Sequence, residues 1–268
     1  MKYLLSCMKE LRRPLACRPL LLLMDYDGTL VPIAKKPSLA RLPKKTENLL
    51  EDLASSEDTK LAIVSGRALT DIYRSIRSKK MIFVGNHGFE IRSKDINFSV
   101  MLPAGFKRCL AEIKERLTDK LACFKGILIE GKGLTLSIHY RLVLKKDVPF
   151  VKNVFRDVMA GYVAAKKARI SIGKKVFEVL PPVAWDKGKA VSWLLSRYRA
   201  KAYLPIYIGD DVTDEDAFRK LKRRGITIFV GRPSAPSSAD YYLKNVKEVT
   251  GLLRTILSLK EGDPLCRN

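Results

Sequence analysis

The chain has 268 residues, and 47% of them are hydrophobic, which provides a core for one or two domains and argues against wholesale disorder. Its 51 basic and 28 acidic residues give a formal net charge of +23, which excludes an acidic, solvating chain and favours anionic partners: phosphorylated metabolites, nucleic acid or an anionic membrane face. The five cysteines are scattered and form no Cys-x-x-Cys motif. A disulfide framework or a structural zinc site is therefore not expected. We expect a cytoplasmic location instead.

The N-terminal segment, residues 1–19, is predicted to be a basic and partly helical lead-in. The longest apolar run near this end, Leu20–Met24, is far shorter than the roughly 20 residues that a transmembrane helix needs. Lys9, Glu10 and Arg12 interrupt the stretch where the apolar part of a secretory signal would lie. We therefore expect no membrane partner.

The first third of the chain alternates continuous apolar runs with amphipathic stretches. Continuous apolar runs bounded by turn residues are typical of buried parallel strands. The pattern predicts strands over Leu20–Met24, Lys60–Val64 and Met81–Val84, and helices over Pro43–Ala54 and Ala68–Ile76. This order of strand, helix, strand, helix, strand predicts βαβ units and a parallel sheet.

The middle third has a different pattern, in which the order helix, strand, strand occurs twice. The predicted helices are Pro103–Leu117 and Pro149–Val163, and the predicted strands are Cys123–Ile129, Leu134–Leu142, Arg169–Ile172 and Val176–Leu180. In the second strand, apolar residues alternate with a polar face that includes His139 and Arg141. We expect an inserted domain with one antiparallel sheet backed by two helices.

The last third returns to the α/β pattern. Helices are predicted over Lys187–Tyr198, Thr213–Arg223 and Val246–Leu259, and strands over Leu204–Ile208 and Thr227–Val230. The predicted fold class is therefore α/β, with a Rossmann-like parallel-sheet core formed by residues 1–102 and 183–268. An inserted α+β domain of αββαββ order occupies residues 103–182.

Carboxylates follow the first predicted strand in the string Asp-Tyr-Asp-Gly-Thr-Leu, residues 25–30. Ligands of open parallel sheets bind beyond the carboxyl ends of the strands. A carboxylate there, Asp25, can attack phosphorus, and a second one two residues later, Asp27, can protonate a leaving alkoxide and then deprotonate water. An Asx-rich turn would explain Asp27 and Gly28 but not the whole string.

Two further features suit a phosphoryl group, although each has an ordinary structural explanation. Ser65-Gly66-Arg67 follows the second predicted strand and can cradle phosphate with a hydroxyl and backbone N–H groups, but serine is also a common helix N-cap. Lys187 begins a helix, where a cation is mildly disfavoured by the helix dipole, and this placement suggests a bound phosphoryl group. In a chain with 51 basic residues, however, one such lysine is no evidence by itself.

An acidic cluster, residues 209–216 (Gly-Asp-Asp-Val-Thr-Asp-Glu-Asp), follows the predicted strand Leu204–Ile208. Thr213 with Asp216 resembles a capping box, but capping leaves Asp210 and Asp211 unexplained. Carboxylates at this edge suit Mg²⁺, which prefers oxygen ligands. Asp25, Asp27 and Asp210 could converge on one ion.

Taken together, the four motifs resemble those of the haloacid dehalogenase superfamily of phosphatases, and the inserted domain resembles that superfamily's C2B cap. A finer likeness is to the trehalose-6-phosphate phosphatase family. It rests on Gly85–Glu90 (Gly-Asn-His-Gly-Phe-Glu), Glu130-Gly-Lys132, His139-Tyr-Arg141, Phe177–Pro181, Asp186–Ala190, Thr213–Asp216, Ala239–Leu243 and Val246–Val249.

This resemblance implies a Mg²⁺-dependent phosphatase that hydrolyses trehalose 6-phosphate through an aspartyl-phosphate. It implies that Asp25 is the nucleophile, Asp27 the general acid/base, and Ser65 and Lys187 the residues that hold the phosphoryl group. Asp25, Asp27 (through its backbone carbonyl), Asp210 and Asp214 would form the metal site. The substrate-binding set would be Arg67, Glu130, Lys132, His139, Arg141 and Glu178.

Three alternatives remain open. The same machinery would serve a phosphatase for sucrose, glucosylglycerol or mannosylglycerate phosphates, or a phosphomutase. The polar face around His139 could simply be solvated. The net charge of +23 could indicate nucleic-acid binding, but the basic residues are dispersed and no recognition motif is present, so no nucleic-acid partner is expected. We expect a monomer whose partner is a small sugar phosphate.

Overall fold

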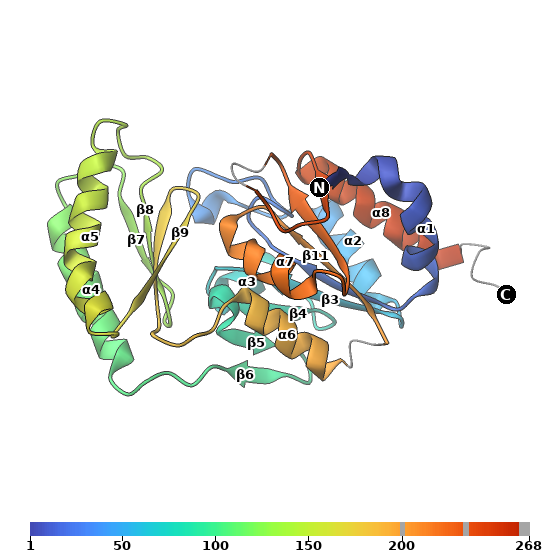
Figure 1. Ribbon diagram of the computed structural model, residues 1–268, viewed down its shortest axis with the longest axis horizontal. Helices are drawn as coiled ribbons and strands as arrows, with labels where there is room; N and C mark the ends of the chain where they lie inside the picture. Colours follow the sequence, from blue (N-terminus) through green and yellow to red (C-terminus); the bar gives the residue numbers. More distant parts are fainter. Residues whose placement is uncertain (199–201, 233–235, 263–268) are drawn as a thin grey trace. The chain divides into compact units, whose positions relative to one another are not determined.

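The computed structural model describes residues 1–198, 202–232 and 236–262, and the chain forms two compact units (Figure 1). Unit 1 comprises Met1–Ser99 and Trp185–Asn268, and unit 2 comprises Val100–Ala184. The unit boundaries thus follow residues 99 and 184, where the sequence predicted 102 and 182.

Unit 1 is built on a mostly parallel sheet. Within the described residues its strand order is β1-β13-β12-β11-β2-β3-β4-β5-β6, and the antiparallel pairs in it are β4 with β5 and β5 with β6. The strands are β1 (Lys2–Tyr3), β2 (Leu20–Met24), β3 (Thr59–Val64), β4 (Ile82–Gly85), β5 (Glu90–Arg92), β6 (Asn97–Ser99), β11 (Leu204–Gly209), β12 (Ile226–Val230) and β13 (Tyr241–Leu243).

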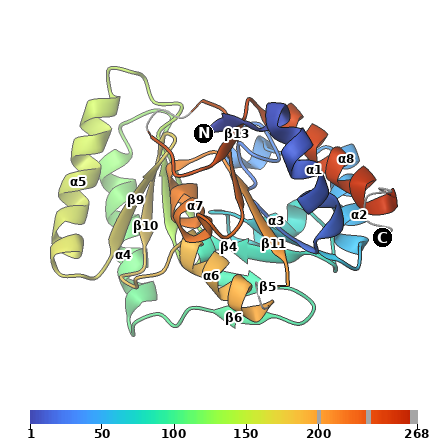
Figure 2. The same ribbon diagram turned by 45° about the vertical axis from the view of Figure 1, so that its right-hand side comes forward.

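Helices cover both faces of this sheet (Figure 2). One face packs against α1 (Met8–Cys17), α2 (Lys44–Ser55), α3 (Leu69–Ser75) and α8 (Val246–Gly262), and the other against α6 (Lys187–Arg197) and α7 (Glu215–Leu221). Side chains of a strand alternate between the two faces. Leu20, Leu22 and Met24 of β2 therefore enter the first core and Leu21 and Leu23 the second, which explains the uninterrupted apolar run.

The predicted alternation of strands and helices along the chain is confirmed for the central, parallel strands, and β2 has its predicted bounds. Four short strands, β1, β5, β6 and β13, were not predicted, because two or three residues show no periodicity of their own. The N-terminal lead-in is partly helical as expected. It also adds β1 to the edge of the sheet beside β13.

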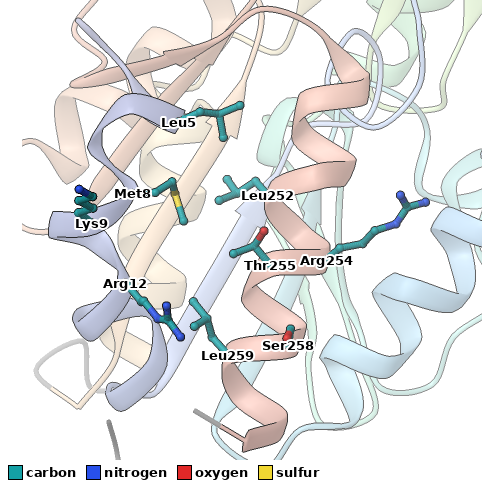
Figure 3. A pocket seen from close by; sticks show the side chains of 9 residues that line it. All are labelled: Leu5, Met8, Lys9, Arg12, Leu252, Arg254, Thr255, Ser258 and Leu259. Atoms are coloured by element: carbon teal, nitrogen blue, oxygen red, sulfur yellow. The ribbon is translucent and has the colours of Figure 1, made fainter. Parts of the chain in front are cut away.

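The lead-in packs on the last described helix. A pocket of about 570 Å³ lies between α1 and α8, and Figure 3 shows Leu5 and Met8 on one side of it and Leu252 on the other. Near this pocket, Lys260 Nζ donates to the carbonyl oxygens of Ala16 and Arg18. These contacts fasten the end of α8 to the end of α1.

Unit 2 has the predicted αββαββ order, with α4 (Phe106–Leu121), β7 (Leu128–Gly131), β8 (Leu136–His139), α5 (Val148–Ala164), β9 (Arg169–Gly173) and β10 (Val176–Leu180). The sheet order is β7-β8-β10-β9, and all pairs are antiparallel. One face of the sheet packs against both helices in a core that includes Ile113, Ile138, Phe155 and Phe177. The prediction of an antiparallel sheet backed by two helices is confirmed.

Two predicted strands in unit 2 were too long. β7 begins at Leu128 instead of Cys123, and β8 covers only Leu136–His139 of the predicted nine residues. Gly126 explains the first difference: its φ is +93°, and a Cβ there would lie 2.3 Å from the carbonyl oxygen of Leu142. After His139 the chain turns, with the Val143 N–H donating to the Tyr140 carbonyl, so alternation does not continue through residue 142.

Two remaining expectations concern cysteines and membranes. Cys7, Cys109 and Cys123 carry free thiols, and Cys17 is disulfide-bonded. Within the described part of the chain, every helix is too short or too polar to span a bilayer.

Candidate active site

Three carboxylates meet at the carboxyl ends of the neighbouring parallel strands β2 and β11. Asp25 follows β2, and Asp210 and Asp214 follow β11. Backbone pairing fixes this meeting, since the Asp25 N–H donates to the Ile208 carbonyl at 2.9 Å. All three carboxylates are buried, and one oxygen of each lies within 4.8 Å of the others.

Lys187 is the cation at the centre of these acids. Its Nζ donates to Asp25 Oδ1 at 2.8 Å and to Asp214 Oδ1 at 2.7 Å, and the side chain is only 3% exposed. The residue begins α6, where the preceding Asp186 caps the helix by accepting from the Lys189 N–H. The helix start therefore holds Lys187 against the acids.

Burial dominates the electrostatics of this cluster. It raises the pKa of the Asp25 carboxyl well above its usual range, Asp214 and Asp210 add to this effect, and Lys187 opposes it. Burial alone would lower the pKa of Lys187, but Asp214 and Asp25 raise it well above its usual value. Lys187 thus stays charged, while one lysine faces three carboxylates. The site consequently favours a further cation.

Asp214 is the most constrained of the three acids. Its Oδ1 accepts from Lys187 and from the Tyr207 hydroxyl at 2.8 Å, and its Oδ2 accepts from the backbone N–H groups of Asp210 and Asp211 at 3.0 Å each. Because both oxygens already accept two hydrogen bonds, Asp214 orients the loop and Lys187.

The helix cap in this loop differs from the prediction. The structure has a capping box formed by Asp211 and Asp214, in front of a short 3₁₀ turn (Val212–Asp214) and α7. The predicted pair of Thr213 and Asp216 is therefore wrong, and Asp216 instead forms an ion pair with Arg219. Of the two acids left unexplained by the sequence, Asp211 is a capping residue and Asp210 belongs to the buried cluster.

The turn after Asp25 needs glycine at position 28. Gly28 has a φ of +89°, and a Cβ on it would lie 2.1 Å from Oδ2 of Asp210. Only a residue without a side chain lets this turn lie directly against the Asp210 carboxylate.

Asp27 lies in a different environment from the buried acids. Arg67 holds its carboxylate with two hydrogen bonds, from Nε to Oδ2 at 2.6 Å and from Nη2 to Oδ1 at 2.7 Å. The Arg67 guanidinium also donates to the Pro37 carbonyl and stacks over the Tyr26 ring. Bidentate pairs of this kind are among the stronger hydrogen-bonded contacts in proteins. The Asp27 carboxylate is therefore not grouped with the three acids, and Arg67, expected to bind substrate, binds Asp27.

The predicted phosphate cradle lies at the end of β3. Ser65 is buried, and its Oγ accepts from the Arg67 N–H at 3.2 Å. His87 lies against this loop, because its N–H donates to the Ser65 carbonyl and a Cβ on Gly66 would meet the imidazole ring at 2.5 Å. His87 lies in the segment Gly85–Glu90 that carries part of the family likeness, but no local signal pointed to this contact.

Unit 2 contains a separate polar cluster on the sheet face opposite its helices. The register aligns Glu130, Ser137 and Glu178 across β7, β8 and β10. Ser137 Oγ donates to Glu178 Oε2 at 2.7 Å, and Lys132 Nζ lies 3.4 Å from Glu178 Oε1. His139 Nε2 and Glu130 Oε2 are 3.0 Å apart.

Four of the predicted sugar-binding residues of unit 2 therefore lie together, and one does not. The hydrogen bond from His139 lowers the pKa of Glu130, and the charge of Lys132 contributes, so Glu130 is an anion near neutral pH. Arg141 lies beyond the end of β8, is exposed, and donates to the Lys174 carbonyl at 2.5 Å. Ser137 belongs to the cluster but was not predicted.

Tyr207 is a second residue that the sequence did not indicate. It is fully buried in β11, and its hydroxyl donates to the same Asp214 oxygen that binds Lys187. Alternation along the strand places its ring edge-on to Phe218 of α7. In a continuous apolar run such a tyrosine is indistinguishable from a core residue, so only the fold assigns it to the site.

Replacing Tyr207 tests this assignment. We expect Tyr207→Phe to lower the free energy of unfolding by about 1.5–3 kcal/mol, because a hydrogen bond to a buried carboxylate is lost. We also expect a lower kcat on phosphate esters with a smaller change in KM, since Asp214 orients Lys187. Tyr203→Phe, whose ring packs against Tyr198, is the matched control. Wild-type kcat in a destabilised Tyr207→Phe would show that the hydroxyl serves stability alone.

A family model and curated relatives match most of this chain. The family model described as trehalose-phosphatase matches residues 23–247. Probable trehalose-phosphate phosphatase H of Arabidopsis thaliana is 32% identical over 261 residues, which cover 91% of this chain and 73% of that protein.

Solved structures show the same fold. The C-terminal domain of C. albicans trehalose-6-phosphate phosphatase has a TM-score of 0.81 at 23% identity, and the match covers 93% of this chain and 96% of that domain. A haloacid dehalogenase-like hydrolase from Bacteroides thetaiotaomicron has a TM-score of 0.64 at 16% identity, with 89% and 100% covered.

Proposed function

Because the chain belongs to the trehalose-phosphatase family, we propose that it hydrolyses trehalose 6-phosphate to trehalose and phosphate. The observation that carries the proposal is the buried group of Asp25, Asp210 and Asp214 around Lys187 at the carboxyl edge of the sheet. A phosphate ester carries up to two negative charges near neutral pH. The three acids would repel it unless cations offset their charge.

The donor set fits Mg²⁺. It consists of carboxylate oxygens, which this ion prefers, and it leaves the group with more acids than cations. Asp25 and Asp210 would supply side-chain ligands and Asp27 its backbone carbonyl, while Asp214, whose oxygens are engaged, would support the site. When bound, Mg²⁺ supplies positive charge that offsets the repulsion between Asp25 and the ester.

Asp25 is the proposed nucleophile. One of its oxygens attacks phosphorus, the P–O bond to the sugar breaks, and an aspartyl-phosphate forms. Water then attacks that phosphorus and restores the Asp25 carboxylate with release of phosphate. Lys187 keeps the Asp25 side chain in place and, with Ser65, binds the phosphoryl oxygens, so that positioning and electrostatics supply most of the catalysis.

Asp27 is the proposed acid and base. It gives a proton to the leaving sugar oxygen and later takes one from the attacking water. Both its oxygens accept hydrogen bonds from Arg67, which suits the ionised carboxylate. Proton delivery therefore requires Asp27 to leave this pair, and Arg67 is a positioning residue in the proposal.

The polar cluster of unit 2 is the proposed sugar-binding set. Its charges are paired with each other, which limits the cost of holding them on a partly buried sheet face. Sugar hydroxyls can both donate and accept, so Glu130, Lys132, His139 and Glu178 offer them partners of both kinds. Unit 2 would then act as the substrate-recognition cap.

The proposed substrate is tested by measuring phosphate release from a panel of sugar phosphates. We expect trehalose 6-phosphate to have the highest kcat/KM, above the phosphates of sucrose, glucosylglycerol and mannosylglycerate. A higher value for one of the latter would replace the substrate and keep the mechanism. Transfer of phosphate to a second sugar without release would instead indicate a phosphomutase.

Variants of the cluster test the role of unit 2. Lys132→Ala, His139→Ala and Glu178→Ala should each lower kcat/KM on trehalose 6-phosphate about ten- to a hundredfold, the value of one charged hydrogen bond. Hydrolysis of p-nitrophenyl phosphate, which has no sugar, should change far less.

Lys152→Ala, at an exposed position of α5, removes the same charge outside the cluster and should leave both activities unchanged. Equal losses on both substrates would mean that the cluster supports folding or the chemical step. The disaccharide assignment would then rest on family membership alone.

A further inference from the structure

One end of the unit 2 sheet carries a dense group of cations that the proposed function does not use. Lys132 lies in the turn before β8, whereas residues 140–146 follow the other end of that strand. The turn between β9 and β10 lies beside this segment, because the Tyr140 N–H donates to the Lys175 carbonyl at 3.1 Å.

A third segment joins the other two. Gly126, just before β7, is so close to residue 142 that a Cβ on it would meet that residue's carbonyl oxygen. We call the surface formed by these three segments the basic end of unit 2. Its exposed cations are Lys125, Arg141, Lys145, Lys146, Lys174 and Lys175.

Two leucines protrude among these cations. Leu142 is 43% exposed and Leu144 is 59% exposed, while Val143 between them is buried in the core of unit 2. The anchored valine therefore fixes a loop that presents apolar side chains to solvent on both sides of it. Moving such exposed apolar side chains out of water is favourable.

The charges that face this loop leave it strongly positive. Asp147 is the one acid in the sequence of the three segments, 123–127, 140–147 and 173–175. It lies half-buried at the start of α5, where its N–H donates to the Leu144 carbonyl. Glu130 of β7 already pairs with His139, the last residue of β8 before this loop. It therefore does not offset the charge of the loop.

We propose that the basic end of unit 2 binds the surface of anionic lipid membranes. Lysine and arginine near such a surface are attracted to its headgroups, and aliphatic side chains between them enter the boundary of the acyl region. This peripheral contact needs no spanning helix. It goes beyond the proposed hydrolysis and differs from the sequence-based expectation of no membrane partner.

Nucleic acid fits this surface less well. Binding of single strands relies on aromatic side chains that stack on bases. The two aromatic residues of these segments are Phe124, which packs against the core of unit 2, and Tyr140, which is buried within it. Leu142 and Leu144, which protrude between the cations, cannot bind phosphate.

Sedimentation with lipid vesicles tests the proposal on the full chain. We expect the protein to sediment with vesicles of phosphatidylcholine and phosphatidylserine in equal parts, and not with phosphatidylcholine alone. Binding should weaken as salt is added, because the cations act through a screened attraction.

Two double variants separate the contributions of charge and apolar side chains. Each basic residue near an anionic surface contributes about fivefold to partitioning, so Lys145→Glu with Lys146→Glu should weaken vesicle binding by roughly a hundredfold or more. Leu142→Ser with Leu144→Ser should weaken it at every salt concentration. Both variants should keep the wild-type thermal unfolding profile, which reports that unit 2 is still folded.

The matched control makes the same change of charge elsewhere in unit 2. Lys107→Glu with Arg108→Glu lies at the start of α4, outside the three segments, and should retain most of the binding. Loss as large as that of the Lys145 and Lys146 variant would overturn the assignment of the surface. So would absence of vesicle binding by the wild type, unchanged binding after the leucine substitutions, or a wild-type protein that shifts single-stranded RNA while ignoring vesicles.

Discussion

Asp25→Asn is expected to abolish phosphate release, with kcat lower by on the order of 10⁴-fold or more, because the amide cannot attack phosphorus. The fold should survive. Burial and the nearby acids disfavour the charged form of Asp25, as its raised pKa indicates, so removing that charge should not lower the melting temperature. Lys187 keeps Asp214 as a partner in the variant.

The readouts are phosphate release from trehalose 6-phosphate and p-nitrophenyl phosphate, together with thermal unfolding. Both activities should fall together, since the nucleophile serves every ester. Near-normal turnover by a folded Asp25→Asn protein would remove Asp25 from the mechanism. A loss confined to trehalose 6-phosphate would also contradict the assignment, because it would place Asp25 in sugar binding.

Removal of divalent metal should have an effect of similar size. Excess chelator should abolish hydrolysis and added Mg²⁺ should restore it, since the buried acids outnumber Lys187 and repel the ester unless a further cation is bound. Asp210→Asn should raise the Mg²⁺ concentration needed for half-maximal activity on the order of tenfold or more, because one ligand is weakened.

Asp211→Asn is the matched control for the metal prediction. Asp211 lies next to Asp210, but its carboxylate caps the turn that precedes α7. Its substitution should cost at most about 1 kcal/mol of stability and leave the Mg²⁺ requirement unchanged. Full activity in chelator, or equal shifts in both variants, would mean that the acidic loop is only a helix start.

The sequence predicted the central strands and the place of each candidate-site motif because these features are local. Strand β2 is an uninterrupted apolar run, and Asp25 follows it directly. In a parallel sheet the carboxyl ends of the strands meet at one edge, so a motif after β2 and another after β11 must approach each other. The meeting of Asp25 and Asp210 follows from that rule.

Strand ends in unit 2 could not be predicted in the same way. Alternation around Leu136 continues in the sequence as far as residue 142, but β8 stops at His139. The chain turns after His139, with the Val143 N–H donating to the Tyr140 carbonyl, and the alternating residues give no sign of this turn. Because β8 ends at His139, Arg141 lies outside the polar cluster, and the residues that follow form the loop of the basic end of unit 2.

By itself, then, the sequence determined the α/β core, the inserted αββαββ unit and the acids and lysine of the candidate site, because apolar periodicity and turn chemistry act over a few residues. The tertiary structure alone decided which side chains those residues meet: Arg67 on Asp27, Tyr207 on Asp214, and Ser137 on Glu178. The first and last of these pairs are 40 and 41 residues apart. Such contacts form only when chain folding brings two strands to neighbouring positions, and hydrogen bonding between distant side chains imposes no period on the sequence.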